Sequence, residues 1–383
     1  MARNDFQGWL PVDAVVVDGR PGLLWMNMTG VELVEPFFQQ TVDRLRSARP
    51  ARDERFTEFD TLVQLEKSFA TVPPSGFIFH SSRCGSTLLA NACRALDGAI
   101  VLSEPAAVDK LVARFITDVD EHGSTREILY SIFLRATVAA LGQRRTGRER
   151  QLFIKFACCS VSQIERIRRI WPNVPWVFLY RDPIETVVSN MQNLPAWLQD
   201  EDHRVLASIT GTATSEVAEM TKEELCARSI AAFYTTAGAV LSCEPALSRD
   251  RRRLACSERE ARNTSTAGET PAVPGKSIRK SGPGPTAHRV ANDHALLLNY
   301  KQLSTAEISN VLKFFGASPT AAEMETIARQ SQNYSKATSA RTFAADAEKK
   351  HTLATDLIRE VTARWADKPY QLLEQKRLGI LKS

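Results

Sequence analysis

Short apolar runs alternate with amphipathic segments along most of the chain from residue 75 onward. Each run has the length and content of a buried strand, and the segments between the runs carry apolar residues at helical spacing. Alternation of buried strands with helices predicts an α/β fold, with a largely parallel sheet covered by helices on both faces. The strand-like runs are residues 76–80, 99–103, 151–156, 174–180 and 295–300.

Both ends of the chain depart from this alternation. Residues 9–35 contain two apolar runs, each closed by a glycine, and this pattern predicts a small hairpin. The C-terminal part is helical in its spacing. We therefore expect a β-rich N-terminal appendage over residues 1–70, a main domain over residues 75–248 and 291–383, and a helical C-terminal tail.

The net charge of +5 is concentrated in one segment. Residues 249–290 contain ten Lys or Arg and four Asp or Glu, and subtracting their net +6 leaves −1 for the rest of the chain. The segment is rich in Arg, Ser, Thr, Gly and Pro, so we expect a disordered insertion. A basic arm for an acidic partner and a mistranslated or unspliced stretch are the alternatives. No nucleic-acid partner is expected for the remaining body.

Composition indicates the compartment. Hydrophobic residues make up 43% of the chain and charged residues 24%, as is ordinary for a soluble globular protein. No apolar stretch is long enough to span a bilayer, and the N-terminus lacks a secretory pattern. The seven cysteines include no CxxC pair, which argues against a zinc site or a disulfide framework. We expect a soluble cytoplasmic protein without a membrane partner.

The loop HSSRCGST, residues 80–87, joins a predicted strand to a predicted helix. This geometry places backbone N–H groups and a helix N-terminus at the carboxyl end of a strand, where anions bind in open α/β sheets. The loop lacks the first glycine and the lysine of GxxxxGK[ST] and offers Arg83, Gly85, Ser86 and Thr87 instead. The alternative is a plain strand–helix turn in which Gly85 permits tight packing.

A second candidate anion anchor lies in WVFLYRDPIETVVSNM, residues 176–191. A predicted strand is followed by Arg181, and Pro183 begins the next helix, where its missing N–H costs nothing. Ser189 stands eight residues after Arg181 and can share a small anion with it. The alternative is a salt-bridged helix cap.

Together the two segments resemble the sulfotransferase family, whose donor is 3′-phosphoadenosine-5′-phosphosulfate. SRCGSTLL (82–89) overlays the family's phosphosulfate loop PKSGTTW or PRSGTTL, and an Arg, Pro and later Ser match its 3′-phosphate motif. The resemblance covers roughly 75–245 and 293–318. It implies a P-loop-like α/β fold, no metal, and donor contacts from Arg83, Cys84, Gly85, Ser86, Thr87, Arg181 and Ser189.

The resemblance also implies catalytic roles. Arg83 would act on the leaving oxygen, and Lys155, at the end of a predicted strand, resembles the catalytic lysine of the tyrosine-sulfating branch. Glu104 stands where that branch has its catalytic base. The alternatives are a solvated lysine and an idle helix N-terminal carboxylate. His122 has no matching motif, and we expect a packed or hydrogen-bonded role for His80.

Lesser matches follow later in the chain. Tyr234 stands where distant branches place an aromatic side chain near the adenine, and the alternative is a core tyrosine. LLLNYKQLS (296–304) resembles the family's VxYExL strand and turn. The closing glycine-rich donor loop, RKGxxGDW, is not visible, and Lys336 and Arg341 are guesses for its cations.

The sequence thus predicts a sulfotransferase that acts on a hydroxyl of an acceptor that the sequence does not identify. Small alcohols, sugars, lipids and peptides are all compatible with it. Residues 195–211, with Trp197, are a candidate lid. One alternative is a phosphotransferase using ATP, which the missing GK[ST] disfavours. The other is a non-catalytic adenosine-bisphosphate binder or interaction protein.

Overall fold

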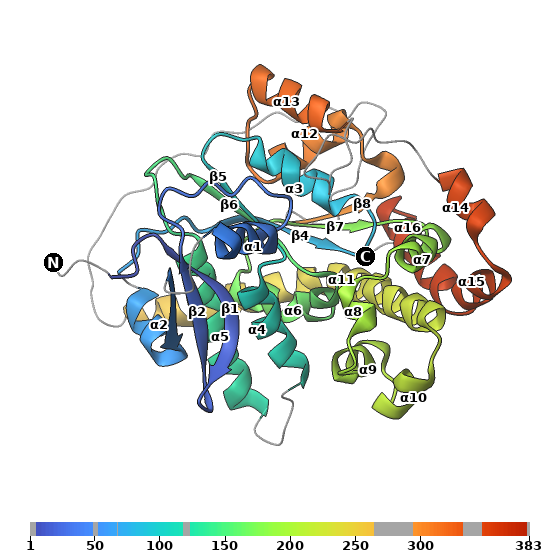
Figure 1. The fold of residues 1–383 in the computed structure, drawn as a ribbon, viewed down its shortest axis with the longest axis horizontal. Helices are drawn as coiled ribbons and strands as arrows, with labels where there is room; N and C mark the ends of the chain where they lie inside the picture. The colour runs from blue at the N-terminus through green and yellow to red at the C-terminus, as the bar shows by residue number, and fades with distance from the viewer. Residues whose placement is uncertain are drawn as a thin grey trace.

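Five parallel strands form the centre of the molecule (Figure 1). The computed structural model describes residues 5–48, 53–66, 68–117, 123–263, 294–331 and 347–380, without the side chains of 123–125 and 243–263. The strand order is β5-β6-β4-β7-β8, so the first strand of the sheet in the chain lies in its middle. The predicted parallel sheet is confirmed. Its strands are β4 (Pro74–His80), β5 (Ala99–Ser103), β6 (Gln151–Lys155), β7 (Trp176–Tyr180) and β8 (Ala295–Asn299).

Helices cover both faces of this sheet, as predicted (Figure 1). Successive side chains of a strand point to opposite faces. In β4, Ile78 therefore packs with α3, α12 and α13, while Phe77 and Phe79 join the larger core on the other face. The helices on the face of Ile78 are α3 (Ser86–Arg94), α12 (Thr305–Phe314) and α13 (Ala321–Ser331). The helices on the other face include α4 (Ala106–Thr117), α5 (Gly123–Leu141), η2 (Cys158–Gln163), α6 (Ile164–Ile170) and α11 (Lys222–Asn263).

The predicted N-terminal hairpin is part of a three-stranded antiparallel sheet. Its third strand was not predicted, because the sequence ERFTE is polar and only Thr57 is buried in it. That threonine accepts a hydrogen bond from the buried Trp25 indole at 2.8 Å. Apolar residues of this sheet belong to the same core as α4 and α5. The elements are β1 (Trp9–Val17), β2 (Arg20–Asn27), α1 (Phe38–Ala48), β3 (Glu54–Glu58) and α2 (Phe59–Glu66).

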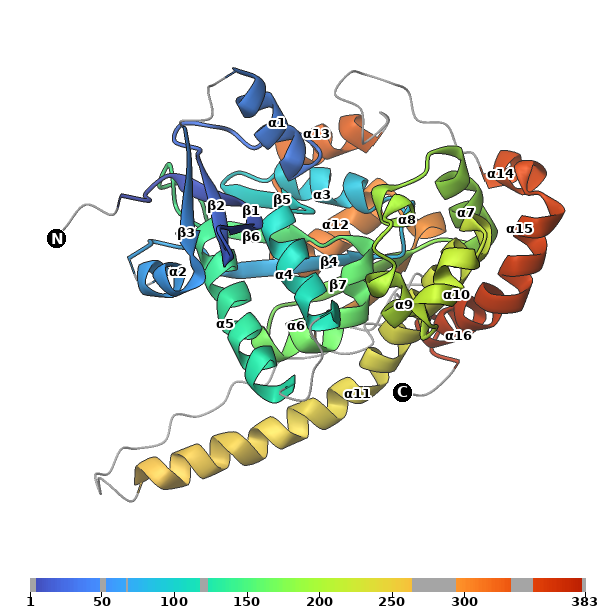
Figure 2. The same cartoon turned by 60° about the horizontal axis from the view of Figure 1, so that its bottom comes forward.

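Helix α11 differs from the prediction. It extends away from the body of the molecule to Asn263 (Figure 2), so residues 249–263 of the segment expected to be disordered are helical. This stretch contains six Arg, two Ala and two Glu, which propagate an existing helix without a new nucleation step. Residues 264–290 of the segment lie outside the described residues. None of the helices described is long and apolar enough to cross a bilayer.

The C-terminal tail is helical, as predicted, and packs against α7 (Pro183–Gln192) and α11. The tail helices therefore lie on the side of the molecule where α7 lies (Figures 1 and 2). The tail comprises α14 (Ala347–Leu353), α15 (Asp356–Val361), a π-helical turn η4 (Thr362–Ala366) and α16 (Asp367–Arg377); shorter helices elsewhere are α8 (Ala196–Gln199), α9 (Arg204–Thr210), α10 (Thr214–Glu219) and η3 (Tyr300–Gln302).

Candidate functional site

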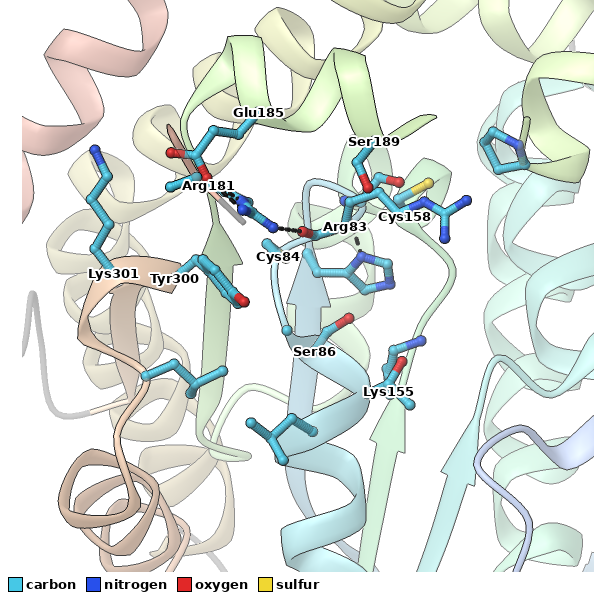
Figure 3. A pocket seen from close by; sticks show the side chains of 18 of the residues that line it. Arg83, Cys84, Ser86, Lys155, Cys158, Arg181, Glu185, Ser189, Tyr300 and Lys301 are labelled. Atoms are coloured by element: carbon cyan, nitrogen blue, oxygen red, sulfur yellow. Dashed lines mark hydrogen bonds and ion pairs between the residues drawn. The ribbon is translucent and has the colours of Figure 1, made fainter. Parts of the chain in front are cut away.

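A cavity of about 790 Å³ opens at the carboxyl edge of the parallel sheet. Loops after β4, β5, β6 and β7 line it, together with residues of α7, η3 and α14 (Figure 3). The structure brings together all but one of the predicted site residues here. Those that line the cavity are Arg83, Cys84, Gly85, Ser86, Thr87, Glu104, Lys155, Arg181 and Ser189.

The loop between β4 and α3 is built from backbone in the left-handed region. Ser82, Arg83 and Gly85 have φ angles of 73°, 50° and 83°. Such successive turns make concave groups of N–H donors that suit anions. The loop leads directly into α3, whose N-terminus carries the positive end of the helix dipole. The predicted anion geometry at this loop is therefore present.

Gly85 is required by both conformation and space. A Cβ atom at this position would lie 2.5 Å from Leu303 Cδ2 and 3.1 Å from Tyr300 Cδ2. We expect Gly85→Ala to lower the free energy of unfolding by about 2–4 kcal/mol, combining left-handed strain with overpacking. Gly147→Ala is the matched control, because Gly147 has a φ of 80° with open space around its Cβ position. This variant should lose only about 1 kcal/mol of unfolding free energy. Urea denaturation would measure both; equal losses would contradict the packing argument.

A buried lysine and a carboxylate meet at the ends of β5 and β6. Lys155 Nζ donates a hydrogen bond to Glu104 Oε1, and its ammonium lies 4.9 Å from the centre of the Phe37 ring. His80 Nε2 is 3.4 Å from the same Oε1. Because His80 Nδ1 accepts the Ser82 N–H at 3.1 Å, the proton of the neutral ring sits on Nε2 and faces Glu104.

Neighbouring groups determine the protonation state of Glu104. Burial opposes ionisation of this carboxyl, but the Lys155 ammonium and His80 outweigh it and hold the pKa of Glu104 well below its usual range. Lys155 is 1% exposed and the Glu104 side chain 32% exposed. Glu104 is therefore an ionised carboxylate at neutral pH, still open to the cavity on one side.

Asp109 on α4 is a second carboxyl beside this pair. Its Oδ1 accepts hydrogen bonds from Ala157 N at 3.1 Å and Ser160 Oγ at 3.4 Å. Burial and then the negative charge of Glu104 raise the pKa of Asp109 to about 7. Asp109 therefore takes up or releases its proton near neutral pH.

This pKa predicts a pH-dependent stability. The folded state holds a proton on Asp109 that the unfolded state has already lost, so unfolding free energy should fall as pH rises from about 4 through 7. Between pH 5 and pH 8 the Asp109 contribution should be about 1–2 kcal/mol after solvent screening. Urea titrations at both pH values would measure it, with Asp109→Asn expected to show a smaller difference than the native chain. An unchanged difference would contradict the assignment.

Arg181 lies in a buried network that connects both predicted anion motifs. Its guanidinium pairs with Glu185 Oε2 at 2.5 Å, and both residues are 3% exposed or less. It lies 4.1 Å from the centre of the Tyr300 ring and donates to the Arg83 carbonyl at 3.4 Å. Asp182 caps α7 by accepting the Glu185 N–H at 3.2 Å. The salt-bridged helix cap considered from the sequence is present, and Arg181 nevertheless lines the cavity.

The Arg83 side chain is directed to the C-terminal end of α7. Its Nε donates to Asn190 Oδ1 at 3.2 Å, and a second guanidinium nitrogen donates to the Asn193 carbonyl. Ser82 Oγ donates to the same Asn190 oxygen at 3.0 Å. Arg83 thus fixes the loop against α7, while its position keeps a positive charge on the cavity wall.

Tyr234 is the predicted site residue that does not line the cavity. It is 1% exposed on α11, and its hydroxyl donates to the Arg181 carbonyl at 2.7 Å. Its position is that of the core tyrosine considered as an alternative. Its hydroxyl reaches the site through the backbone of Arg181.

The structure adds residues that the sequence did not reveal. Lys350 on α14 is 4% exposed and lines the cavity, as does Tyr300. The two cations suggested from the sequence for the closing donor loop, Lys336 and Arg341, lie outside the described residues, as does His122. Two consecutive lysines in a sequence give no indication that one of them is buried. The packing of α14 on α7 is what identifies Lys350.

A second cavity, of about 750 Å³, adjoins the first. Glu104 and Trp197 line both. Trp197 belongs to α8, in the segment predicted as a lid. The second cavity is mainly apolar, with Val112, Ile116, Ala157, Cys159, Val205 and Leu206 in its wall. Glu104 therefore stands between a cavity rich in cations and hydroxyls and a cavity that is mostly apolar.

Comparisons with known proteins give distant structural likeness only. No protein-family model matches the chain, and no curated relative matches it. Among solved structures, a sulfotransferase domain from the curacin biosynthetic pathway is similar with a TM-score of 0.37 and 11% identity, over 80% of this chain and 98% of that chain. A sulfotransferase domain from the Synechococcus PCC 7002 olefin synthase is similar with a TM-score of 0.32 and 12% identity, over 80% of this chain and 94% of that one.

Proposed function

We propose that this chain is a sulfotransferase that moves a sulfuryl group from 3′-phosphoadenosine-5′-phosphosulfate to a hydroxyl of its acceptor. The observation that carries the proposal is the Glu104–Lys155 pair at the junction of the two cavities. It places a carboxylate and a cation where donor and acceptor would meet. The left-handed loop and α3 supply the anion site on the donor side.

The residues present fit such a donor. Its two phosphate-bearing ends need separate cationic or N–H-rich sites, and the cavity wall offers the loop with Ser86 and Thr87 on one side and Arg181 with Ser189 on another. Lys155 and Lys350 add buried positive charge. When bound, the donor supplies an activated sulfuryl group.

Each residue then has a role that follows from its surroundings. Glu104 is ionised, so it can accept the proton of an acceptor hydroxyl placed against Oε1. Lys155 is buried beside it and offers a fixed positive charge for the negative charge of the transferring group. His80 holds the turn at Ser82 through Nδ1 and faces Glu104 through Nε2, which positions the carboxylate.

The adjoining cavity supports an acceptor with an apolar body and one hydroxyl. Most of the exposed surface of its wall is apolar, with Trp197 at the junction, and such a lining selects for apolar surface. Asp109, whose pKa the charge of Glu104 helps to raise, also lines that wall. Aliphatic or aryl alcohols are therefore the acceptors to try first.

One observation favours a non-catalytic adenosine-bisphosphate binder as the second candidate. Arg83 and Arg181 already have protein partners, in Asn190 with the Asn193 carbonyl and in Glu185. If these bonds persist in the presence of the nucleotide, the site would bind it without organising transfer.

Thermal stabilisation by adenosine 3′,5′-bisphosphate tests the donor site, with ATP–Mg and AMP as comparison ligands. A ligand that binds only the native state, at a hundred times its dissociation constant, adds about 2.7 kcal/mol of stability. A selective shift with the bisphosphate supports the proposal. An equal or larger shift with ATP–Mg would favour a phosphotransferase, and no shift in a folded sample would contradict donor binding. Turnover with alcohol acceptors then separates an enzyme from a binder.

A further inference from the structure

Three metal-ligating side chains converge at the start of α7, outside the Glu104–Lys155 pair. They are Asp182, the N-cap of α7, Glu185 in the first turn of α7 and His351 of α14. His351 Nε2 lies 3.7 Å from Asp182 Oδ1 and 3.7 Å from Glu185 Oε1. The three ligand atoms all lie within 4.8 Å of one another.

These side chains do not satisfy one another by hydrogen bonding. Both distances of 3.7 Å exceed the usual range for a nitrogen–oxygen hydrogen bond. Glu185 is 1% exposed, and while its Oε2 takes the Arg181 guanidinium, its Oε1 has no hydrogen-bond partner among the described residues. A buried carboxylate oxygen without a partner is costly. It is also aimed at the point where Asp182 and His351 meet.

The spacing and the ligand types fit a metal ion. In a tetrahedral zinc site, bonds of about 2.0–2.2 Å place neighbouring ligand atoms roughly 3.3 Å apart, so small side-chain movements would suffice here. Imidazole suits zinc and other transition metals, whereas magnesium and calcium prefer all-oxygen ligands. We propose that Asp182, Glu185 and His351 bind a divalent transition-metal ion, with Zn²⁺ as the best fit.

Binding would connect two elements that line the cavity. His351 follows Lys350 on α14, and the carboxylates lie on α7, which also carries Ser189. An ion held by both helices would fix α14, and with it Lys350, against α7. The site does not depend on the proposed sulfuryl transfer, since none of its ligands acts on the transferring group.

Zinc titration of the full chain, freed of any affinity tag and stripped with EDTA, tests the site. By isothermal titration calorimetry we expect one Zn²⁺ per chain and no comparable binding of Mg²⁺. His351→Ala should weaken zinc binding at least about 100-fold, since it removes a direct ligand. Asp182→Asn should weaken it too, while an asparagine still caps α7. His203→Ala is the matched control, because among the described residues no third metal-ligating side chain converges on His203 and its neighbour Asp202. This variant should bind zinc as the native chain does.

Melting temperatures of the metal-free proteins separate loss of the site from loss of the fold. Zinc should raise the melting temperature of the native chain and of His203→Ala, and leave that of His351→Ala unchanged. The proposal is overturned if the native chain shows no saturable zinc binding. It is equally overturned if His351→Ala and Asp182→Asn keep the native affinity and stoichiometry, since the ion would then bind elsewhere.

Discussion

Lys155→Met is expected to lower the turnover number at least about 1000-fold while the chain stays folded. Lys155 is 1% exposed and donates to Glu104, so its charge is buried and held in place beside the proposed base. Preorganised charge in such a site is commonly the largest single contribution to catalysis, and loss of one donor costs about 100- to 1000-fold. Here the same lysine also orients the base, which adds to the loss.

Glu104→Gln separates the role of Glu104 as a base from the role of Lys155 as a positive charge. Glutamine keeps the shape of the side chain and can still accept from Lys155, but it cannot take a proton from the acceptor. We expect turnover to fall about 100- to 10,000-fold with binding of adenosine 3′,5′-bisphosphate retained. Because the pair acts as a unit, the double variant should lose much less than the product of the two single losses.

The measurement is release of adenosine 3′,5′-bisphosphate from radiolabelled donor, with 4-nitrophenol and 1-octanol as probe acceptors. Lys155→Met leaves Glu104 without its ammonium partner, so we also expect a stability loss of about 1–3 kcal/mol, less than for a fully buried pair. Arg20→Met is the control: it breaks an exposed pair with Glu58, with side chains 59% and 46% exposed, far from the cavity. It should leave turnover intact. Turnover within tenfold of the native value in Lys155→Met would refute the role of Lys155.

The fold was predictable from the sequence where local pattern decides it. Buried strands of a parallel sheet have a continuous apolar run, and each of the five has such a run at its centre. The third strand of the N-terminal sheet was missed because its sequence is polar and it owes its place to pairing with β2. Residues 249–263 were expected to be disordered, because composition does not show that a helix already formed over residues 222–248 continues through them.

The residues of the candidate site could be predicted only where they lie next to strands and loops that have a recognisable sequence pattern. Glu104 and Lys155 follow from their places at strand ends, and the pairing of Ser103 with Lys155 in the sheet explains why they meet. Lys350 and His351 come from a helix whose position depends on packing with α7. Nothing in the local sequence specifies that packing, so neither residue could be assigned.

Lys350→Met is expected to weaken binding of adenosine 3′,5′-bisphosphate about 10- to 100-fold. Lys350 is 4% exposed and lines the cavity from α14. A charge-assisted hydrogen bond from a buried lysine to a phosphate contributes about 1.5–3 kcal/mol, which corresponds to that range of affinity. Isothermal titration calorimetry would measure the dissociation constants.

Lys349→Met is the matched control, since Lys349 precedes Lys350 on the same helix, carries the same charge and is exposed. Its removal should change affinity less than about threefold at physiological salt, where exposed charges are screened within about 8 Å. If both variants weakened binding equally, Lys350 would act only through the general field of the helix. A loss confined to Lys350 would instead mean that α14 completes the donor cavity by direct contact, a role for the C-terminal tail that depends on its packing against α7.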